Sequence, residues 1–274
     1  MVTLAPLPSS ISPSKVGTFT DCPRRFQYQS IDRLEQPPTI WTLKGTLVHA
    51  ALEGLFSVEP ALRTLDVALA ALDAAFAAPD GAAGVQSVGL EGDKLASFHE
   101  ESTSLVHRYF ELEDPTKVDA VGVELRVDTT LTSTRDGAPV HLRGIIDRLD
   151  RNDEGDLVVV DYKTGRAPAP GRERARLAAV ETYALLCERA LGVRPVMVRL
   201  MYLAAPVVIE RSIGTSEVRR QERRTVEVWH AISRAYAAGT FRPSPGPLCN
   251  FCAFTDRCEA APAALRARVS SSAS

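Results

Sequence analysis

The stretch GIIDRLDRNDEGDLVVVDYKTG, residues 144–165, decides the fold. It begins inside a strand pattern that runs from Val140 to Leu149 and continues through a turn that contains asparagine, aspartate and glycine. Leu157 to Val160 is then a continuous apolar run, which is typical of a strand buried on both faces. The stretch therefore predicts two neighbouring strands joined by a short turn.

Asp147, Asp161 and Lys163 carry the chemistry of this stretch, and both aspartates are expected at strand ends. Lys163 stands two residues after Asp161, so the two side chains project to the same face. Carboxylates so placed can hold Mg²⁺ or Mn²⁺, which polarises a scissile phosphate and lowers the pKa of a bound water, and a lysine can orient that water. A lone D-x-K is more often a capped turn beside a surface lysine. The buried strand before it and Thr164-Gly165 after it favour a hydrolytic metal site here.

The rest of the chain predicts an α/β fold. Apolar residues alternate from Val121 to Val127, and Pro195 to Leu203 predicts a further strand. Pro79 to Gly89 is rich in glycine and alanine and predicts a loop. Helices are expected over Ser14–Gln29, Leu43–Leu55, Ala61–Ala77, Gly92–Leu112, Arg172–Leu191 and Ser216–Ala238.

The composition bounds the class of protein. The chain has 274 residues and 29.7 kDa, with 45% hydrophobic and 24% charged residues, which suits one large or two small domains. No apolar run approaches the roughly 18 to 20 residues that cross a bilayer, and Met1 to Ser14 lacks the pattern of a secretion signal, so we expect a cytoplasmic protein. The formal net charge is -2, so any binding of nucleic acid must come from a local basic surface.

Four of the five cysteines have the spacing of metal ligands. Cys249, Cys252 and Cys258 form a C-x2-C-x5-C cluster, and Cys22 is the natural candidate for a fourth ligand. The spacing by itself allows either zinc or an iron-sulfur cluster. Cys187 stands alone on an apolar helix face and is expected to be a buried core residue.

Several short motifs occur in a fixed order, and together they resemble the RecB-type branch of the PD-(D/E)xK nucleases. This branch includes the nuclease domains of RecB and AddB and the CRISPR-associated four-cysteine exonucleases. The resemblance covers nearly the whole chain and implies a mixed sheet flanked by helices, with a helical N-terminal region and an iron-sulfur-bound C-terminal tail. The motifs are Ser14 to Phe26 (S-x7-C-P-x2-F), Gly45 to His49 with Leu52-Glu53, Gly144 to Asp147, Asp161 to Gly165, Tyr183 and the cysteine triplet.

The resemblance implies a catalytic metal site. Carried onto this chain, it makes His49, Asp147 and Asp161 the metal ligands and Lys163 the catalytic lysine. By itself His49 would be a core or surface histidine. Neutral imidazole is compatible with Mn²⁺, and a site with two carboxylates has room for it.

The resemblance also implies a [4Fe-4S] cluster held by the cysteines that share the family's layout. Such a cluster would join the N-terminal helix to the C-terminal tail, and its role would be structural because the binding energy of a metal centre is folding energy. The implied ligands are Cys22, Cys249, Cys252 and Cys258.

DNA contacts are expected beside the metal site. Relatives usually place a glutamine four residues before the helix tyrosine, where this chain has Ala179, so we expect altered DNA placement or reduced activity. Tyr183 is a candidate substrate contact, with a packed aromatic as the alternative. Arg166 and Arg172 follow Lys163 closely and are candidate phosphate contacts. We expect sequence-tolerant binding of single-stranded or frayed DNA ends.

The predicted function is that of a divalent-metal-dependent exonuclease in DNA recombination or repair. No G-x4-G-K-[ST] motif occurs in the sequence, so unwinding would come from a helicase partner. Two alternatives share the same residues: a non-catalytic DNA-binding or complex-stabilising subunit that keeps the fold, and a CRISPR spacer-processing nuclease. We expect one nuclease domain over 14–259, with a helical part 14–115, a catalytic core 116–240 and a cysteine segment 241–259, between a flexible lead-in 1–13 and a tail 260–274.

Overall fold

The computed structural model describes residues 5–169 and 174–262. By its contacts the chain divides into two compact units. We call Pro38–Asp128 together with Gly144–Gln221 the central unit. The terminal unit combines three separate segments, Met1–Pro37, Thr129–Arg143 and Glu222–Ser274.

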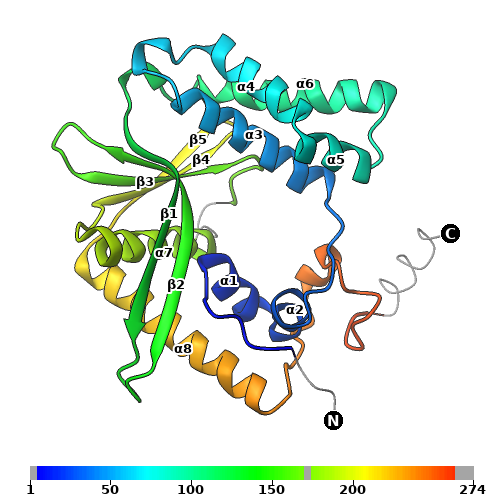
Figure 1. The fold of residues 1–274 in the computed structure, drawn as a ribbon, viewed down its shortest axis with the longest axis vertical. Coiled ribbons are helices and arrows are strands. Elements are labelled where there is room, and N and C mark those ends of the chain that lie inside the picture. Colours follow the sequence, from blue (N-terminus) through cyan, green and yellow to red (C-terminus); the bar gives the residue numbers. More distant parts are fainter. Residues whose placement is uncertain (1–4, 170–173, 263–274) are drawn as a thin grey trace. The chain divides into compact units, whose positions relative to one another are not determined.

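A five-stranded sheet in the order β1-β2-β3-β4-β5 confirms the expected mixed α/β fold (Figure 1). β3 pairs antiparallel with β2 and parallel with β4, while β4 pairs antiparallel with β5. The parallel pair needs a crossover, which helix α7 (Arg174–Leu191) provides. β5 was not expected, because it lies at the sheet edge and lacks a buried run. The strands are β1 (Asp119–Thr132), β2 (Pro139–Arg151), β3 (Leu157–Lys163), β4 (Met197–Tyr202) and β5 (Val207–Ser212).

Helices of the central unit cover one face of β3. Val158, Val160 and Tyr162 alternate along β3 and pack into one apolar cluster with Leu47 and Leu105. Side chains two residues apart share a face of a strand, so Asp161 and Lys163 face away from this cluster. The helices are α3 (Ile40–Phe56), α4 (Leu65–Ala77), α5 (Pro79–Ser87) and α6 (Gly92–Tyr109), with short turns η2 (Pro60–Leu62) and η3 (Pro115–Lys117).

Residues 79–89 are the clearest error of the sequence-based prediction, because α5 replaces the expected loop. Pro79 is tolerated in the first turn of a helix, where its missing N–H costs nothing. The glycines serve close packing: a Cβ on Gly81 would lie 2.0 Å from the carbonyl oxygen of Ala75, and one on Gly84 would lie 2.5 Å from Leu43 Cδ1. Glycine therefore marks contact with neighbouring elements here rather than a loop.

The terminal unit contains α1 (Pro13–Asp21), α2 (Pro23–Phe26), the π-helical turn η1 (Gln27–Ile31) and the C-terminal turn η4 (Pro247–Phe251). The expected helix from Ser14 to Gln29 is interrupted at Cys22, whose backbone is extended with φ -158°. Ser12, two residues before the expected start, caps α1 by accepting a hydrogen bond from the backbone N–H of Lys15 at 3.3 Å. Helix α8 (Thr215–Ala237) continues from the central into the terminal unit.

The expected lead-in 1–13 is shorter than predicted. Ile11 is 1% exposed and its N–H donates to the carbonyl oxygen of His141 at 2.8 Å, so it forms a bridge beside Leu142. Pro13 already belongs to α1. Residues 11–13 are thus part of the packed terminal unit, because an apolar side chain and a paired backbone hold them.

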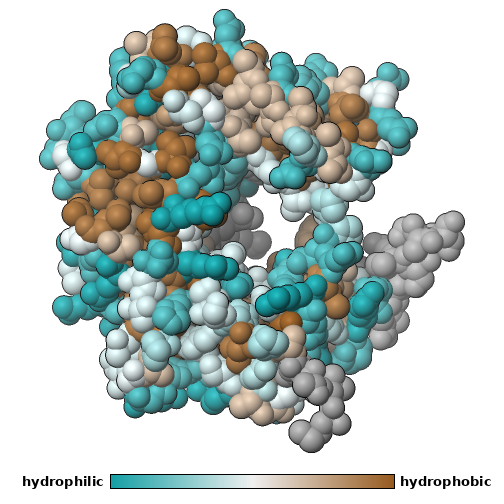
Figure 2. All heavy atoms as spheres, viewed as in Figure 1, coloured by the Kyte–Doolittle hydropathy of each residue, from teal (hydrophilic) through white to brown (hydrophobic). Residues whose placement is uncertain are grey.

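In the part of the chain that the structure describes, no helix is long and apolar enough to cross a membrane. Hydrophobic and hydrophilic residues are mixed over α3 to α6 on the face that Figure 2 shows. Charged residues on these helices interrupt each apolar run.

A buried cation lies on the core face of the β2–β3 pair. Arg148 is fully buried and forms ion pairs with Glu113 and Asp150, whose side chains are 12% and 9% exposed. Its Nη1 also donates to the hydroxyl groups of Tyr162 at 2.7 Å and Tyr109 at 3.2 Å. Two carboxylates thus balance the one guanidinium, and its loss would leave both acids without their main partner.

We expect Arg148→Met to lower the free energy of unfolding by about 3–5 kcal/mol, the typical cost of breaking a buried pair by removing one partner. Arg151→Met is the matched control, because Arg151 is 52% exposed and pairs with Asp119 at 3.5 Å. Exposed pairs of this kind contribute less than about 1 kcal/mol. Urea denaturation of both variants measures the difference, and equal losses would contradict the assignment of Arg148 as a structural centre.

Candidate active site

Pairing of β2 with β3 brings the two predicted aspartates together. The register matches Arg148 with Val160, so Asp147 and Asp161 are neighbours one step further along the ladder. The N–H of Tyr162 donates to Asp147 Oδ2 at 2.8 Å, which fixes the Asp147 carboxylate against β3. Asp147 lies inside β2 rather than at its end, as β2 continues to Arg151.

His49 reaches the same place from α3. Its Nε2 lies 3.2 Å from the carbonyl oxygen of Tyr162, and its Nδ1 lies 3.6 Å from Asp147 Oδ2. A carbonyl oxygen can only accept, so the hydrogen-bonded Nε2 carries a proton. In the neutral ring Nδ1 then presents a lone pair toward a carboxylate, an arrangement that favours a cation between them.

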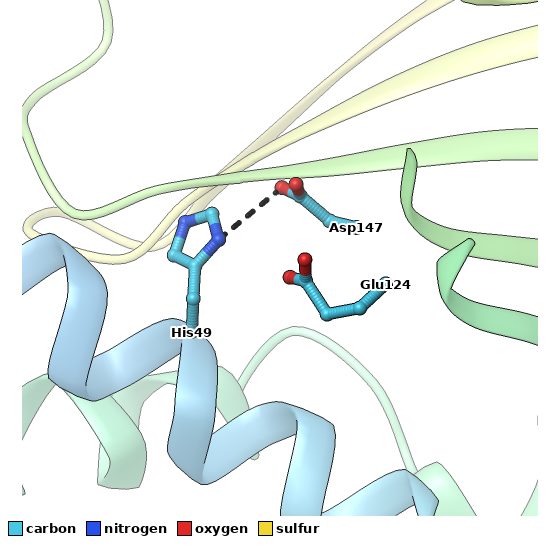
Figure 3. A group of neighbouring side chains, drawn as sticks. All are labelled: His49, Glu124 and Asp147. Carbon is cyan, nitrogen blue, oxygen red and sulfur yellow. Dashed lines mark ion pairs between the residues drawn. The ribbon is translucent and has the colours of Figure 1, made fainter. Parts of the chain in front are cut away.

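Glu124 completes this group, and the sequence did not indicate it. One ligand atom from each of His49, Glu124 and Asp147 can be chosen so that all three lie within 4.8 Å of one another. Figure 3 shows the three side chains pointing toward a common centre, with the His49–Asp147 ion pair dashed. In the described residues this is the one such group of histidine, cysteine and acidic side chains.

The backbone of Glu124 is unusual. Its φ is +43°, in the left-handed region that residues with a Cβ rarely adopt. Burial raises the pKa of Glu124 above its ordinary value, and the neighbouring Asp147 carboxylate raises it further. A strained backbone and a destabilised carboxylate are both features that cluster at functional sites, and no sequence motif marks either of them.

Asp161 and Lys163 form an ion pair next to this group. Burial raises the pKa of Asp161, the charge of Lys163 opposes that rise, and the Asp147 carboxylate adds to it. Asp161 Oδ2 is buried and accepts no hydrogen bond from the described residues, which leaves Lys163 as its partner. The possible ligands are oxygens of two strand aspartates, a glutamate oxygen and an imidazole nitrogen. This set of ligands fits a hard divalent cation.

Tyr183 lies over the start of the motif on β2. A Cβ on Gly144 would lie 2.7 Å from Tyr183 Cε1 and 3.0 Å from Leu186 Cδ1, so any other residue here would displace the Tyr183 side chain. Burial raises the pKa of Tyr183 well above its ordinary value, and the charges of Asp161 and Asp147 raise it further. The Tyr183 hydroxyl therefore stays protonated and can act as a donor.

Of the two arginines predicted to contact phosphate, one lies among the described residues. Arg166 is exposed in the loop after Lys163, whereas Arg172 lies outside the described residues. Glu181 does not stand in for the glutamine replaced by Ala179, because it is 4% exposed and bound by Arg220 at 2.9 Å and by Gln221 at 2.6 Å.

Comparison with known proteins shows the family of the chain. The family model of the PD-(D/E)XK nuclease superfamily matches residues 10–259. The chain belongs to this superfamily. It is 26% identical over 269 residues to the Gene 69 protein of Mycobacterium phage D29, a match that covers 90% of this chain and 95% of that protein. The crystal structure of SSO0001 aligns with a TM-score of 0.46 at 13% identity, over 94% of this chain and 89% of that one.

Membership identifies the general chemistry of the site. Nucleases of this superfamily cleave nucleic acid with divalent metal ions, and the group of His49, Glu124 and Asp147 is a possible metal site.

The nuclease also has a cysteine pocket, in its terminal unit. Cys22 lines it together with the C-terminal triplet Cys249, Cys252 and Cys258. The N–H of Ser244 donates to Cys22 Sγ at 3.4 Å, and the N–H of Gly246 donates to Cys249 Sγ at 3.5 Å. The two ends of the chain are further joined by Arg24 to Glu259 at 2.7 Å and by the Tyr28 hydroxyl to the carbonyl oxygen of Arg257 at 3.1 Å.

These thiols are not gathered as ligands of a single ion would be. Four thiolates 2.3 Å from one zinc ion would stand about 3.8 Å apart. Within the described residues, no three of the cysteine Sγ atoms lie within 4.8 Å of one another. Cys187 lies outside the pocket and is fully buried, and burial raises the pKa of its thiol to about 12, which agrees with the expected core role.

We expect Mn²⁺ binding to weaken by about tenfold or more in Glu124→Gln, as in His49→Ala, because loss even of a group that supports a metal ligand costs 10–100-fold in affinity. Isothermal titration with MnCl₂ measures this. Asp128→Asn is the matched control, since Asp128 is an exposed carboxylate four residues further along β1. Unchanged affinity in Glu124→Gln would remove Glu124 from the ligand set.

Proposed function

We propose that this nuclease is a divalent-metal-dependent deoxyribonuclease that acts as an exonuclease on single-stranded or frayed DNA ends during recombination or repair. The observation that carries the proposal is the convergence of His49, Glu124 and Asp147 beside the Asp161–Lys163 ion pair. A chain that had kept the fold for structural reasons alone would have no need to hold so many carboxylates in a half-buried site.

The side chains divide the work of hydrolysis. His49 Nδ1 and the Asp147 and Glu124 carboxylates would hold Mg²⁺ or Mn²⁺, with Asp161 as a further oxygen ligand. A bound ion would polarise the scissile phosphate and acidify a water molecule. Lys163 is ion-paired with Asp161, and it would orient the attacking water and offset charge on the phosphate.

Two further side chains, those of Tyr183 and Arg166, would contact the DNA. The protonated Tyr183 hydroxyl lies near the same carboxylates and donates to a phosphate oxygen or to a water. Arg166 is exposed just beyond Lys163, where its positive charge would attract the phosphate backbone of a DNA strand. A helicase partner would supply single-stranded ends, since the sequence contains no nucleotide-binding G-x4-G-K-[ST] motif.

A non-catalytic DNA-binding subunit is the second candidate, and Ala179 is the observation that favours it. The glutamine absent at this position would have contributed a polar group beside Tyr183. The intact Asp147, Asp161 and Lys163 weigh against this candidate, and an activity assay separates the two.

We further propose that the cysteine pocket holds a [4Fe-4S] cluster. Four thiols line one pocket, and backbone N–H groups donate to two of them. The Nε atoms of Arg24 and Arg25 are buried without a hydrogen-bond partner among the described residues, next to where a negatively charged cluster would lie. The cluster would stabilise the terminal unit by linking segments far apart in the sequence.

In the presence of Mn²⁺, Lys163→Ala should reduce degradation of end-labelled single-stranded DNA by about 10²–10⁴-fold, the usual contribution of a positioned proton-transfer group. Asp161→Ala should abolish it, and both variants should keep the circular dichroism spectrum of the wild type. Substrates labelled at the 5′ or 3′ end give the polarity. Cleavage by both variants at the wild-type rate would refute the site, and an inactive wild type would favour the non-catalytic subunit.

Anaerobically purified protein should be brown and contain about four irons per chain, the content of a [4Fe-4S] cluster on four thiolates. Cys22→Ser should lose most of this iron together with thermal stability. Cys187→Ser is the control and should retain the iron, because Cys187 lies outside the pocket. A colourless protein with one zinc per chain would overturn the cluster assignment.

A further inference from the structure

Trp41 is a large aromatic side chain left in solvent. It stands in the first turn of α3 and is 77% exposed. Lys44 Nζ lies 5.3 Å from the centroid of its ring, and Lys44 is itself buried and ion-paired with Glu101. One side of the indole therefore rests on a fixed cation, while most of the ring stays open to solvent.

The position of Trp41 on α3 links it to the candidate active site. Trp41, Gly45 and His49 follow at intervals of four, so they lie along one face of the helix. Eight residues of helix span about 12 Å. Between the two rings Gly45 adds no side chain, and a Cβ there would lie 3.5 Å from Thr164 Oγ1, directly after Lys163. The face that carries Trp41 thus runs along the end of β3 to the metal ligands.

We propose that Trp41 is a base-stacking platform that holds single-stranded DNA a few nucleotides away from the scissile phosphate. The proposal rests on the nuclease function proposed above. Successive nucleotides are about 3.4 Å apart when stacked, and further apart in an extended strand, so 12 Å corresponds to roughly two to four of them. Every base offers a π-face, so stacking on tryptophan suits a nuclease that tolerates any sequence.

The surroundings of Trp41 suit a nucleotide, which offers both a flat base and polar groups. The residues that flank it on the exposed side of this turn include Thr39 and Thr42, which hydrogen-bond each other's backbone in a capping box. Ile40, next to Trp41, is 41% exposed and adds apolar surface, while the hydroxyl groups of Thr39 and Thr42 give the ring polar neighbours. Bases inside a duplex cannot reach such a ring, so the platform selects unpaired strands.

Fluorescence tests the contact directly, since Trp41 and Trp229 are the two tryptophans of the chain. In Trp229→Phe, titration with a dT₁₂ oligonucleotide should quench the remaining emission of Trp41. Ca²⁺ in place of Mn²⁺ prevents cleavage during the titration. Emission that does not change while the oligonucleotide binds would overturn the platform.

Affinity gives the second measurement. In fluorescence anisotropy, Trp41→Ala should bind labelled dT₁₂ roughly 5- to 150-fold more weakly, the equivalent of about 1–3 kcal/mol of stacking, while Trp41→Phe should lose less. A strand with abasic sites should bind wild type and Trp41→Ala equally. Leu62→Ala is the matched control, because Leu62 is a 58% exposed apolar residue of the same unit.

The outcomes separate the platform from the nuclease function. Equal dT₁₂ affinity in wild type and Trp41→Ala would overturn the platform while leaving the nuclease assay to decide the function. Failure of the wild type to bind any DNA, together with absence of cleavage, would overturn both proposals.

Discussion

Strand β3 is buried on both faces, and its period-two alternation divides the central unit into a core and a site. Val158, Val160 and Tyr162 face the apolar cluster under α3 and α6, whereas Asp161 and Lys163 face the opposite side. A shift of the β2–β3 register by one residue would send the charged pair into the core and the valines into the site. The register is fixed in part by the site itself, since the N–H of Tyr162 donates to Asp147.

Charged side chains are balanced differently on the core face and on the site face of the β2–β3 pair. On the core face Arg148 is surrounded by Glu113, Asp150 and two tyrosine hydroxyls, so its charge is satisfied by the chain. On the site face three carboxylates gather with one lysine and a histidine, and burial together with mutual repulsion raises the pKa of Asp161 and Glu124. An excess of negative charge in a half-buried place is stable when a cation joins it. The site face is thus a possible metal site, whereas the charges on the core face are balanced by the chain itself.

The terminal unit is stabilised differently from the central unit. Its short helices are interrupted at Cys22, and its core includes a small aromatic group in which Phe19 and Phe26 meet edge to face at 5.5 Å and Phe241 stacks on Phe26 at 6.3 Å. Segments from both ends of the chain meet around the cysteine pocket. A metal cluster bound there would add folding energy where helices of four to nine residues add little of their own.

The sequence by itself determined the parts of this protein that depend on local order. The apolar run before Asp161 specified a buried strand, the D-x-K spacing put Asp161 and Lys163 on one face, and the cysteine spacing identified the residues that line one pocket. His49 was found only because its motif stands in the family's order, since a lone histidine on an apolar helix carries no signal of its own.

Tertiary structure alone decided the remaining features. Glu124 joins the possible metal ligands through a left-handed backbone that no residue pattern encodes, and α5 forms because neighbouring helices accept its glycines at close range. The hydrogen bond from His49 to Tyr162, which leaves Nδ1 facing the carboxylates, joins residues 113 positions apart. Local patterns specify which face a side chain takes on its own strand or helix, but the distance between side chains of different elements is set by packing.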